Sequence, residues 1–205
     1  MAITINGTGS ITGLTAGGLP DGSVVAGDLA SSLDLSGKTV TLPSGTGGKV
    51  LQIESVILTN AFNQTITSTS SVISGFTVDI TKVSSTSDIL VLAMLNYTHT
   101  NSYARFNVVL TRGGTPISVG TSTGNRLAAT LAPSAATGGE SYGPPNWSVI
   151  HRDEGAGAGT HTYDFRAYDL DNADQTISFN RGQTDSNTDS YHRTASTIVL
   201  LEIEP

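Results

Sequence analysis

Residues from Val50 onward alternate between short apolar segments and turn residues, and this pattern constrains the fold more than any other feature. Segments rich in Val, Ile, Thr, Leu and aromatic residues are separated by Gly, Asn, Asp, Ser and Pro. Short strands at regular spacing are typical of an antiparallel sandwich or barrel. We predict eight strands: Val50–Thr59, Phe76–Val83, Asp88–Thr98, Ala104–Arg112, Ser148–His151, His161–Tyr168, Gln175–Asn180 and Ala195–Glu202. The predicted fold is all-β, an antiparallel jelly-roll sandwich, with a tight turn at Gly113-Gly114.

The composition excludes several classes of function. The chain has 17 acidic and 10 basic residues, a net charge of −7, which argues against nucleic-acid binding because phosphate neutralisation needs a basic surface. It has no Cys, so disulfides, thiolate metal sites and Cys nucleophiles are excluded. No apolar run reaches the roughly 20 residues of a membrane span, and Met1–Ile5 lack the features of a secretory signal. We therefore expect a non-secreted protein without membrane insertion.

Residues 1–49 differ from the rest of the chain. They are rich in Gly, and no aromatic residue precedes Phe62. Such a segment buries too little apolar surface to offset its own chain entropy. Two interpretations remain open: a disordered tail, or a segment that becomes ordered when several copies or a docking partner supply hydrophobic surface.

Local patterns within this segment are weak. Asp28–Leu33 could form a short helix capped by Asp28, and Thr39–Leu42 alternates like a short strand. Ser44–Gly48 has the composition of a hinge. We predict an extended attachment or shaft segment with little regular structure over residues 1–49, followed by a head domain over residues 50–205.

Two predicted strands are apolar on both faces. Ile89–Leu95 contains only apolar side chains, and Ile198–Leu201 repeats this near the C-terminus. A two-sheet sandwich covers one face of each sheet, and leaving the other face wet forgoes about 1.5–3 kcal/mol per large side chain. We predict that neighbouring copies of the chain cover this face through Ile89, Val91, Leu95, Val199 and Leu201. Alternatively, loops fold over the face, or both strands lie at the centre of a closed barrel.

The sequence offers little for catalysis or for cofactors. The four histidines are scattered, and Gly45–Lys49 lacks the Ser or Thr that completes a phosphate-binding loop. Most acidic residues fall in turns, whereas glycoside hydrolysis needs paired carboxylates on strands that line a cleft. An oxygen-rich loop that could hold Ca²⁺ lacks the central Gly and closing Glu of an EF-hand, which favours an acidic turn; it contains Asp169, Asp171, Asn172 and Asp174. We predict a non-enzymatic protein with no metal and no cofactor.

Two loops are candidates for recognition. Tyr142, Asn146 and Trp147 belong to the long loop Ala132–Trp147, and Tyr191 and His192 belong to a second loop, Asp185–His192. Aromatic rings beside polar groups are typical of contacts with sugars or proteins. Trp147 also has a purely structural interpretation, as a core side chain at the start of a strand.

Several segments together resemble a known family. They are Gly75–Thr81, Ser87–Leu92, Asn107–Ile117, Gly159–Tyr163 and Ala195–Ile203. In this order they resemble the C-terminal jelly-roll domain of tailed-bacteriophage fibre proteins, which is similar to the trimeric complement-globular-head and tumour-necrosis-factor fold. Gly17–Val24, Asp28–Leu33 and Lys38–Pro43 are similar to attachment and shaft segments of small virion proteins.

The resemblance implies a homotrimer, a virion location, and binding rather than catalysis. It transfers no functional residue, because the family shares no receptor-contact motif. The expected function is a short trimeric fibre that docks on other virion proteins through residues 1–49 and binds a host surface glycan or protein through its head loops. A capsid decoration or head-fibre protein is the alternative, and a glycan-active tailspike enzyme is a second alternative that the carboxylate pattern disfavours.

Overall fold

The computed structural model describes residues 4–5, 11–12, 50–99, 105–132, 143–171 and 174–204. The chain divides into two units, Met1–Gly47 and Gly48–Pro205. In the first unit, β1 (Thr4–Ile5) pairs antiparallel with β2 (Ile11–Thr12). The predicted short helix at 28–33 and the predicted strand at 39–42 lie outside the described residues.

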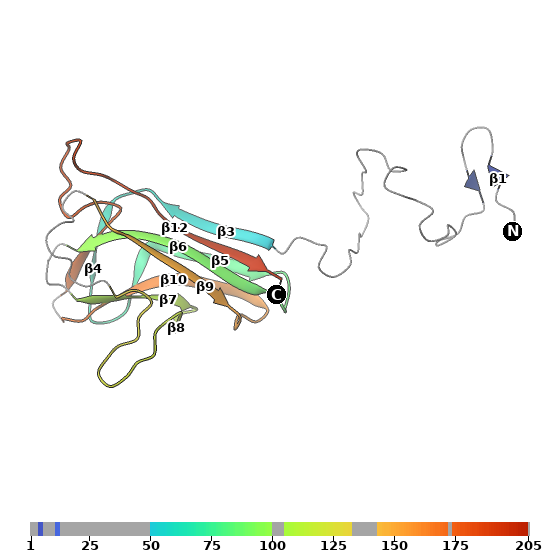
Figure 1. Cartoon of the computed structure of the whole chain (residues 1–205), viewed down its shortest axis with the longest axis horizontal. Helices are drawn as coiled ribbons and strands as arrows, with labels where there is room; N and C mark the ends of the chain where they lie inside the picture. The colour runs from blue at the N-terminus through green and yellow to red at the C-terminus, as the bar shows by residue number, and fades with distance from the viewer. Residues whose placement is uncertain are drawn as a thin grey trace. The chain divides into compact units, whose positions relative to one another are not determined.

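The second unit, called the β unit below, is built from two antiparallel sheets (Figure 1). Its described elements are all strands: β3 (Val50–Leu58), β4 (Phe62–Ile66), β5 (Ser71–Lys82), β6 (Asp88–His99), β7 (Phe106–Arg112), β8 (Thr115–Ile117), β9 (Asn146–Asp153), β10 (Gly159–Asp169), β11 (Gln175–Phe179) and β12 (Ser196–Ile203). The smaller sheet has the order β5-β10-β7-β8. The larger sheet has the order β3-β12-β6-β11-β4, and β9 also pairs with β6. The described residues contain no helix that could cross a membrane.

All eight predicted strands are present, with differences at their ends, and two further strands of the β unit were missed, as were β1 and β2 of the first unit. β5 begins at Ser71, five residues before the predicted start at Phe76. β4 and β8 were not predicted. The predicted turn at Gly113-Gly114 is confirmed: φ is +56° and +79° at these two residues, and they connect β7 to β8.

The core lies between the two sheets and follows the alternation of each strand. In β5, Phe76, Val78 and Ile80 are buried, and the residues between them are exposed. Phe165 of β10 packs against Phe76 with ring centroids 5.6 Å apart. A bulge interrupts the pairing of β5 with β10 near Gly75, where φ is +73° and an added Cβ would lie 3.0 Å from Leu58 Cδ2. Glycine is therefore required at this bend.

A buried carboxylate joins the turn between β5 and β6 to the larger sheet. Glu202 lies in β12 and accepts N–H donation from Val83 at 3.0 Å and from Ser84 at 2.9 Å, as well as donation from the Ser87 hydroxyl. Gln52 donates to it at 2.5 Å. Burial would raise the pKa of Glu202, but these hydrogen bonds outweigh it and lower the pKa to about 2.

A buried lysine joins the same hydrogen-bond network. The Lys82 Nζ donates to the carbonyl oxygens of Ser87 and of Ala156, the latter at 2.5 Å. Ser87 therefore connects the buried cation to the buried carboxylate of Glu202. Each buried charge has several partners, which is the condition for a charged group to be tolerated in an interior.

We predict that Glu202→Gln lowers the free energy of unfolding by about 2 kcal/mol near neutral pH, because hydrogen bonds to a charged acceptor are lost. The native pKa lies below the unfolded value, so the ionised carboxylate stabilises the fold above about pH 4.5 and loses this effect as the pH falls toward 2. Urea unfolding across this range should show the difference between variant and wild type shrinking with acidity. Glu54→Gln, at an exposed position of β3, is the control; a pH-independent difference for Glu202→Gln would contradict the prediction.

Candidate functional site

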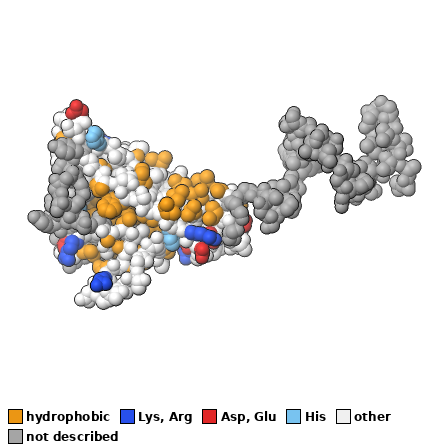
Figure 2. Space-filling model, in the orientation of Figure 1, with side chains coloured by type: hydrophobic (Ala, Val, Ile, Leu, Met, Phe, Trp, Pro, Cys, Tyr) orange, Lys and Arg blue, Asp and Glu red, His pale blue; other side chains and the backbone are white. Residues whose placement is uncertain are grey.

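The larger sheet has a second apolar face, directed away from the core. The register aligns Val199 with Leu92, and Leu92 with Ile150; it also aligns Leu201 with both Ile53 and Leu90. This outer apolar face runs across four strands and consists of Ile53, Ile57, Leu90, Leu92, Met94, Ile150, Val199 and Leu201. Ile53, Ile57 and Ile150 are 58%, 65% and 75% exposed. Figure 2 shows hydrophobic side chains gathered where β3, β12 and β6 lie in Figure 1.

The predicted interface residues divide between the two faces of this sheet. Val199 and Leu201 lie on the outer apolar face and are half-buried. Ile89, Val91 and Leu95 are buried in the core of the single chain, with exposures of 0%, 0% and 1%, so their assignment to a subunit interface is wrong. β6 has apolar side chains at both its odd-numbered and its even-numbered positions. The alternation of its own sequence therefore does not determine which of these two sets of side chains faces the core. Leu90, Leu92 and Met94 occupy the outer positions instead.

Trp147 is part of the core boundary. Its ring stacks on Tyr97 with centroids 6.0 Å apart, and it lies opposite Leu95 in the register of β9 with β6. The indole Nε1 is buried and has no hydrogen-bond partner among the described residues. Asn146 donates its amide to Asn96 Oδ1 at 3.2 Å and accepts from the Ser148 hydroxyl. These contacts favour the structural interpretation of Trp147, and Tyr142 lies outside the described residues.

The second candidate loop forms a polar projection at one end of the β unit. Asp185 forms an ion pair with Arg193 at 2.8 Å and approaches Arg181 at 3.6 Å. Tyr191 is half-buried and His192 is exposed. A methyl group at Gly143 would lie 3.8 Å from the Cβ of His192, so the two candidate loops meet. In Figure 1 this loop lies at the end of the β unit opposite to the start of β3.

The acidic loop after β10 is held by an ion pair. Asp171 contacts the guanidinium of Arg105 at 2.6 Å and accepts the Arg105 backbone N–H at 2.7 Å. These backbone and side-chain bonds from Arg105 lower the pKa of Asp171. Among the described residues, no group of three or more His, Asp and Glu side chains is placed to hold a metal ion. Asn172 of this loop lies outside the described residues.

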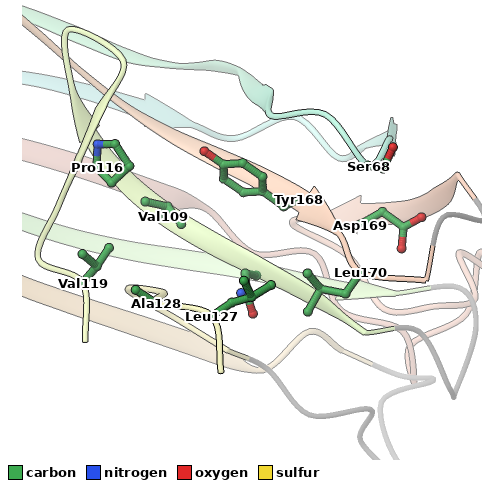
Figure 3. Close-up of a pocket in the computed structure, with 10 residues that line it drawn as sticks. Ser68, Val109, Pro116, Val119, Leu127, Ala128, Tyr168, Asp169 and Leu170 are labelled. Atoms are coloured by element: carbon green, nitrogen blue, oxygen red, sulfur yellow. The ribbon is translucent and has the colours of Figure 1, made fainter. Parts of the chain in front are cut away.

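A pocket on the smaller sheet was not predicted from the sequence. It has a volume of about 470 Å³ and lies between the outer face of β7 and β10 and the loop at 118–131 (Figure 3). Val109 and Tyr168 form its floor, with Pro116 and Val119 at one end and Ser68 and Asp169 at the other. This volume is called the side pocket below. The loop is held against β7 by mutual hydrogen bonds of 2.9 Å between the backbones of Val108 and Leu131.

No protein-family model matches this chain, and no curated protein sequence matches it. The candidate sites therefore depend on geometry and on the chemistry of the described side chains.

We predict that Trp147→Ala lowers the free energy of unfolding by about 3 kcal/mol, because it removes the ring that packs on Tyr97. His192→Ala, at an exposed position of the neighbouring loop, should change it by less than about 0.5 kcal/mol. Denaturant unfolding followed by far-ultraviolet circular dichroism measures both, since Trp147 is the only tryptophan of the chain. Equal stability of the Trp147 variant and wild type would instead favour a surface role for this ring.

Proposed function

We propose that this protein is a non-enzymatic structural component of a phage virion, a short trimeric fibre that docks through residues 1–49 and binds a host surface through its β unit. The outer apolar face is the observation that carries the proposal. Its three most exposed isoleucines alone would recover about 1.5–3 kcal/mol each on burial. A contiguous apolar surface of this kind is typical of an interaction site.

The strand pairing supports the jelly-roll part of the proposal. When β4 and β11 are set aside, the eight remaining strands form four pairs nested like a long folded hairpin: β3 with β12, β5 with β10, β6 with β9, and β7 with β8. When this long hairpin folds over on itself, β12 also pairs with β6 in the larger sheet, and β10 also pairs with β7 in the smaller sheet. A jelly roll is built by this winding, and the resemblance to trimeric phage fibre heads then supplies the number of subunits.

Copies of the same chain are the proposed cover of the outer apolar face. In the trimeric heads that the chain resembles, the inner sheets of three subunits pack around the axis. The larger sheet is the counterpart here, because its outer face is apolar across four strands. One ion pair, Arg152 with Asp88 at 2.5 Å, lies at the edge of this face, next to Leu90. The outer face of the smaller sheet carries Asp164, which is ion-paired with Arg166 at 2.9 Å and hydrogen-bonded to Thr111.

The two ends of the β unit support docking at one end and recognition at the other. Val50 pairs with Ile203, and Leu58 pairs with Ser196, so the chain enters the β unit at the end away from residues 181–195 (Figure 1). The attachment segment would then approach one end, and the loop at 185–192 would face outward. Three heads per trimer and many trimers per particle multiply weak contacts into avidity.

We predict that light scattering gives the full-length protein the mass of a trimer. The double variant Ile57→Lys with Ile150→Lys should have the mass of a monomer. Both side chains are more than half exposed, so lysine is tolerated in a single chain but disfavours burial between copies. Val83→Lys, which replaces a 70% exposed valine outside this face, is the matched control and should remain trimeric. A wild-type monomer, or a double variant that stays trimeric, would overturn the proposed assembly.

We predict that deleting residues 1–49 leaves a folded trimer that no longer joins the virion, because assembly and docking belong to different units. Circular dichroism and light scattering test the fold and the mass, and electron microscopy of particles locates the full-length protein. An unfolded truncated chain would place the domain boundary elsewhere. Density on the capsid rather than the tail would favour a head fibre or decoration protein over a tail fibre.

A further inference from the structure

We propose that the side pocket binds a neutral hexose unit of a glycan, with the Tyr168 ring and the Asn107 amide as its principal contacts. The inference deepens the proposed function by naming a class of receptor, and its biological meaning rests on that function. All residues that line the side pocket belong to one chain, so the site does not depend on assembly.

Asn107 provides the polar contact. It is 7% exposed, lines the pocket from the outer face of β7, and lies opposite Tyr168 in the strand register. Its side-chain amide makes no hydrogen bond within the described part of the chain. The amide is open to the pocket rather than sealed in the core, so it can both donate and accept hydrogen bonds there. A ligand that offers both donors and acceptors would therefore be favoured at this position.

The surroundings of Asn107 are mostly apolar. Val109 lies beside it on the floor, and Pro116, Val119 and Leu127 form the walls (Figure 3). Tyr168 is half-buried and presents its ring toward this space (Figure 3). A hexose combines an apolar face of C–H groups with hydroxyls at its edge, so it can pack on the ring and also pair with the amide. A purely apolar ligand would leave the amide unpaired.

The charge of the pocket selects against acidic sugars. Asp169 lines one end and is 3% exposed, and one of its oxygens accepts the Asp171 N–H at 2.9 Å. No Lys or Arg side chain is among the residues that line the pocket within the described part of the chain. A sialic acid or uronic acid would place its carboxylate near that of Asp169, and the repulsion between like charges disfavours binding.

The position of the pocket suits recognition. β5 ends at Lys82, and the next residue, Val83, donates its backbone N–H to Glu202. Glu202 pairs with Gln52, so this end of β5 lies near the point where the chain enters the β unit. Ser71 at the other end of β5 pairs with Ala167 of β10, close to Asp169. The acidic end of the pocket therefore lies toward the end of the β unit that is remote from Val50. The outer apolar face belongs to the other sheet, so trimer assembly leaves the pocket open.

Saturation-transfer NMR on the full-length protein tests the inference, with D-glucose, D-galactose, D-mannose and N-acetyl-D-glucosamine as neutral probes and N-acetylneuraminic acid as the anionic probe. At least one neutral sugar should bind, and the anionic sugar should not. Asn107→Ala and Tyr168→Leu should each weaken that binding about tenfold or more, without changing the mass of the assembly. Tyr168→Leu replaces a half-buried side chain with an apolar one, so it tests the site even where Asn107→Ala disturbs the fold.

Asn187→Ala is the matched control, because Asn187 lies in the loop at 185–192 and lines the polar depression there. Loss of binding in this variant but not in the pocket variants would move the site to the loop and overturn the inference. Binding of N-acetylneuraminic acid alone, or of no probe, would also overturn it. A trimer that binds no sugar contradicts the pocket inference alone, whereas a monomer that binds sugar through Tyr168 contradicts the proposed assembly alone.

Discussion

One chain covers only one of the two apolar faces of its larger sheet, and most features of the structure depend on this. The smaller sheet closes the inner face, where Val91, Ile198 and Leu200 are fully buried. The outer face carries Leu92, Val199 and their neighbours toward solvent. Antiparallel sheets normally place polar side chains on the side away from the core. A sheet that departs from this rule across four strands has a surface that is favourable to bury and costly to leave wet.

The two-sheet arrangement also decides where charged side chains can be buried in the β unit. Buried ionic groups must lie where local hydrogen-bond partners surround them. Glu202 accepts from donors in the turn that joins β5 to β6, and Lys82 donates to an acceptor in the same turn. Glu202 projects inward from β12 at the same parity as the apolar Ile198 and Leu200. Backbone N–H groups make this possible, because they solvate the carboxylate without a cationic partner. These contacts therefore hold the turn between β5 and β6 against β12, at the end of the sandwich where the chain enters.

Short-range patterns predicted the elements well and their faces less well. All eight predicted strands exist, because alternation of apolar and turn residues is a local property. β8 was missed because it has three residues and contains Pro116, which suits only an edge strand. The parity of β6 was wrong because it has apolar side chains at both parities, and the choice depends on the register with β12 and β9. The side pocket was missed because Asn107 and Tyr168 are far apart in sequence and meet only through pairing of β7 with β10.

The two sheets thus present different surfaces, a broad apolar face and a pocket, and under the proposed function this difference would divide assembly from recognition. The outer apolar face is broad, and its ion pair of Asp88 with Arg152 lies at one edge, so the face suits a protein partner of matching shape. The side pocket has a volume of about 470 Å³, and it places an aromatic ring beside an amide that is open to the pocket, so it suits a small ligand with both apolar and hydrogen-bonding groups. Because the surfaces lie on opposite sides of the sandwich, packing copies together through one leaves the other exposed on every subunit. If the side pocket binds sugar as proposed, repetition of a weak site on every subunit would strengthen attachment through the number of copies.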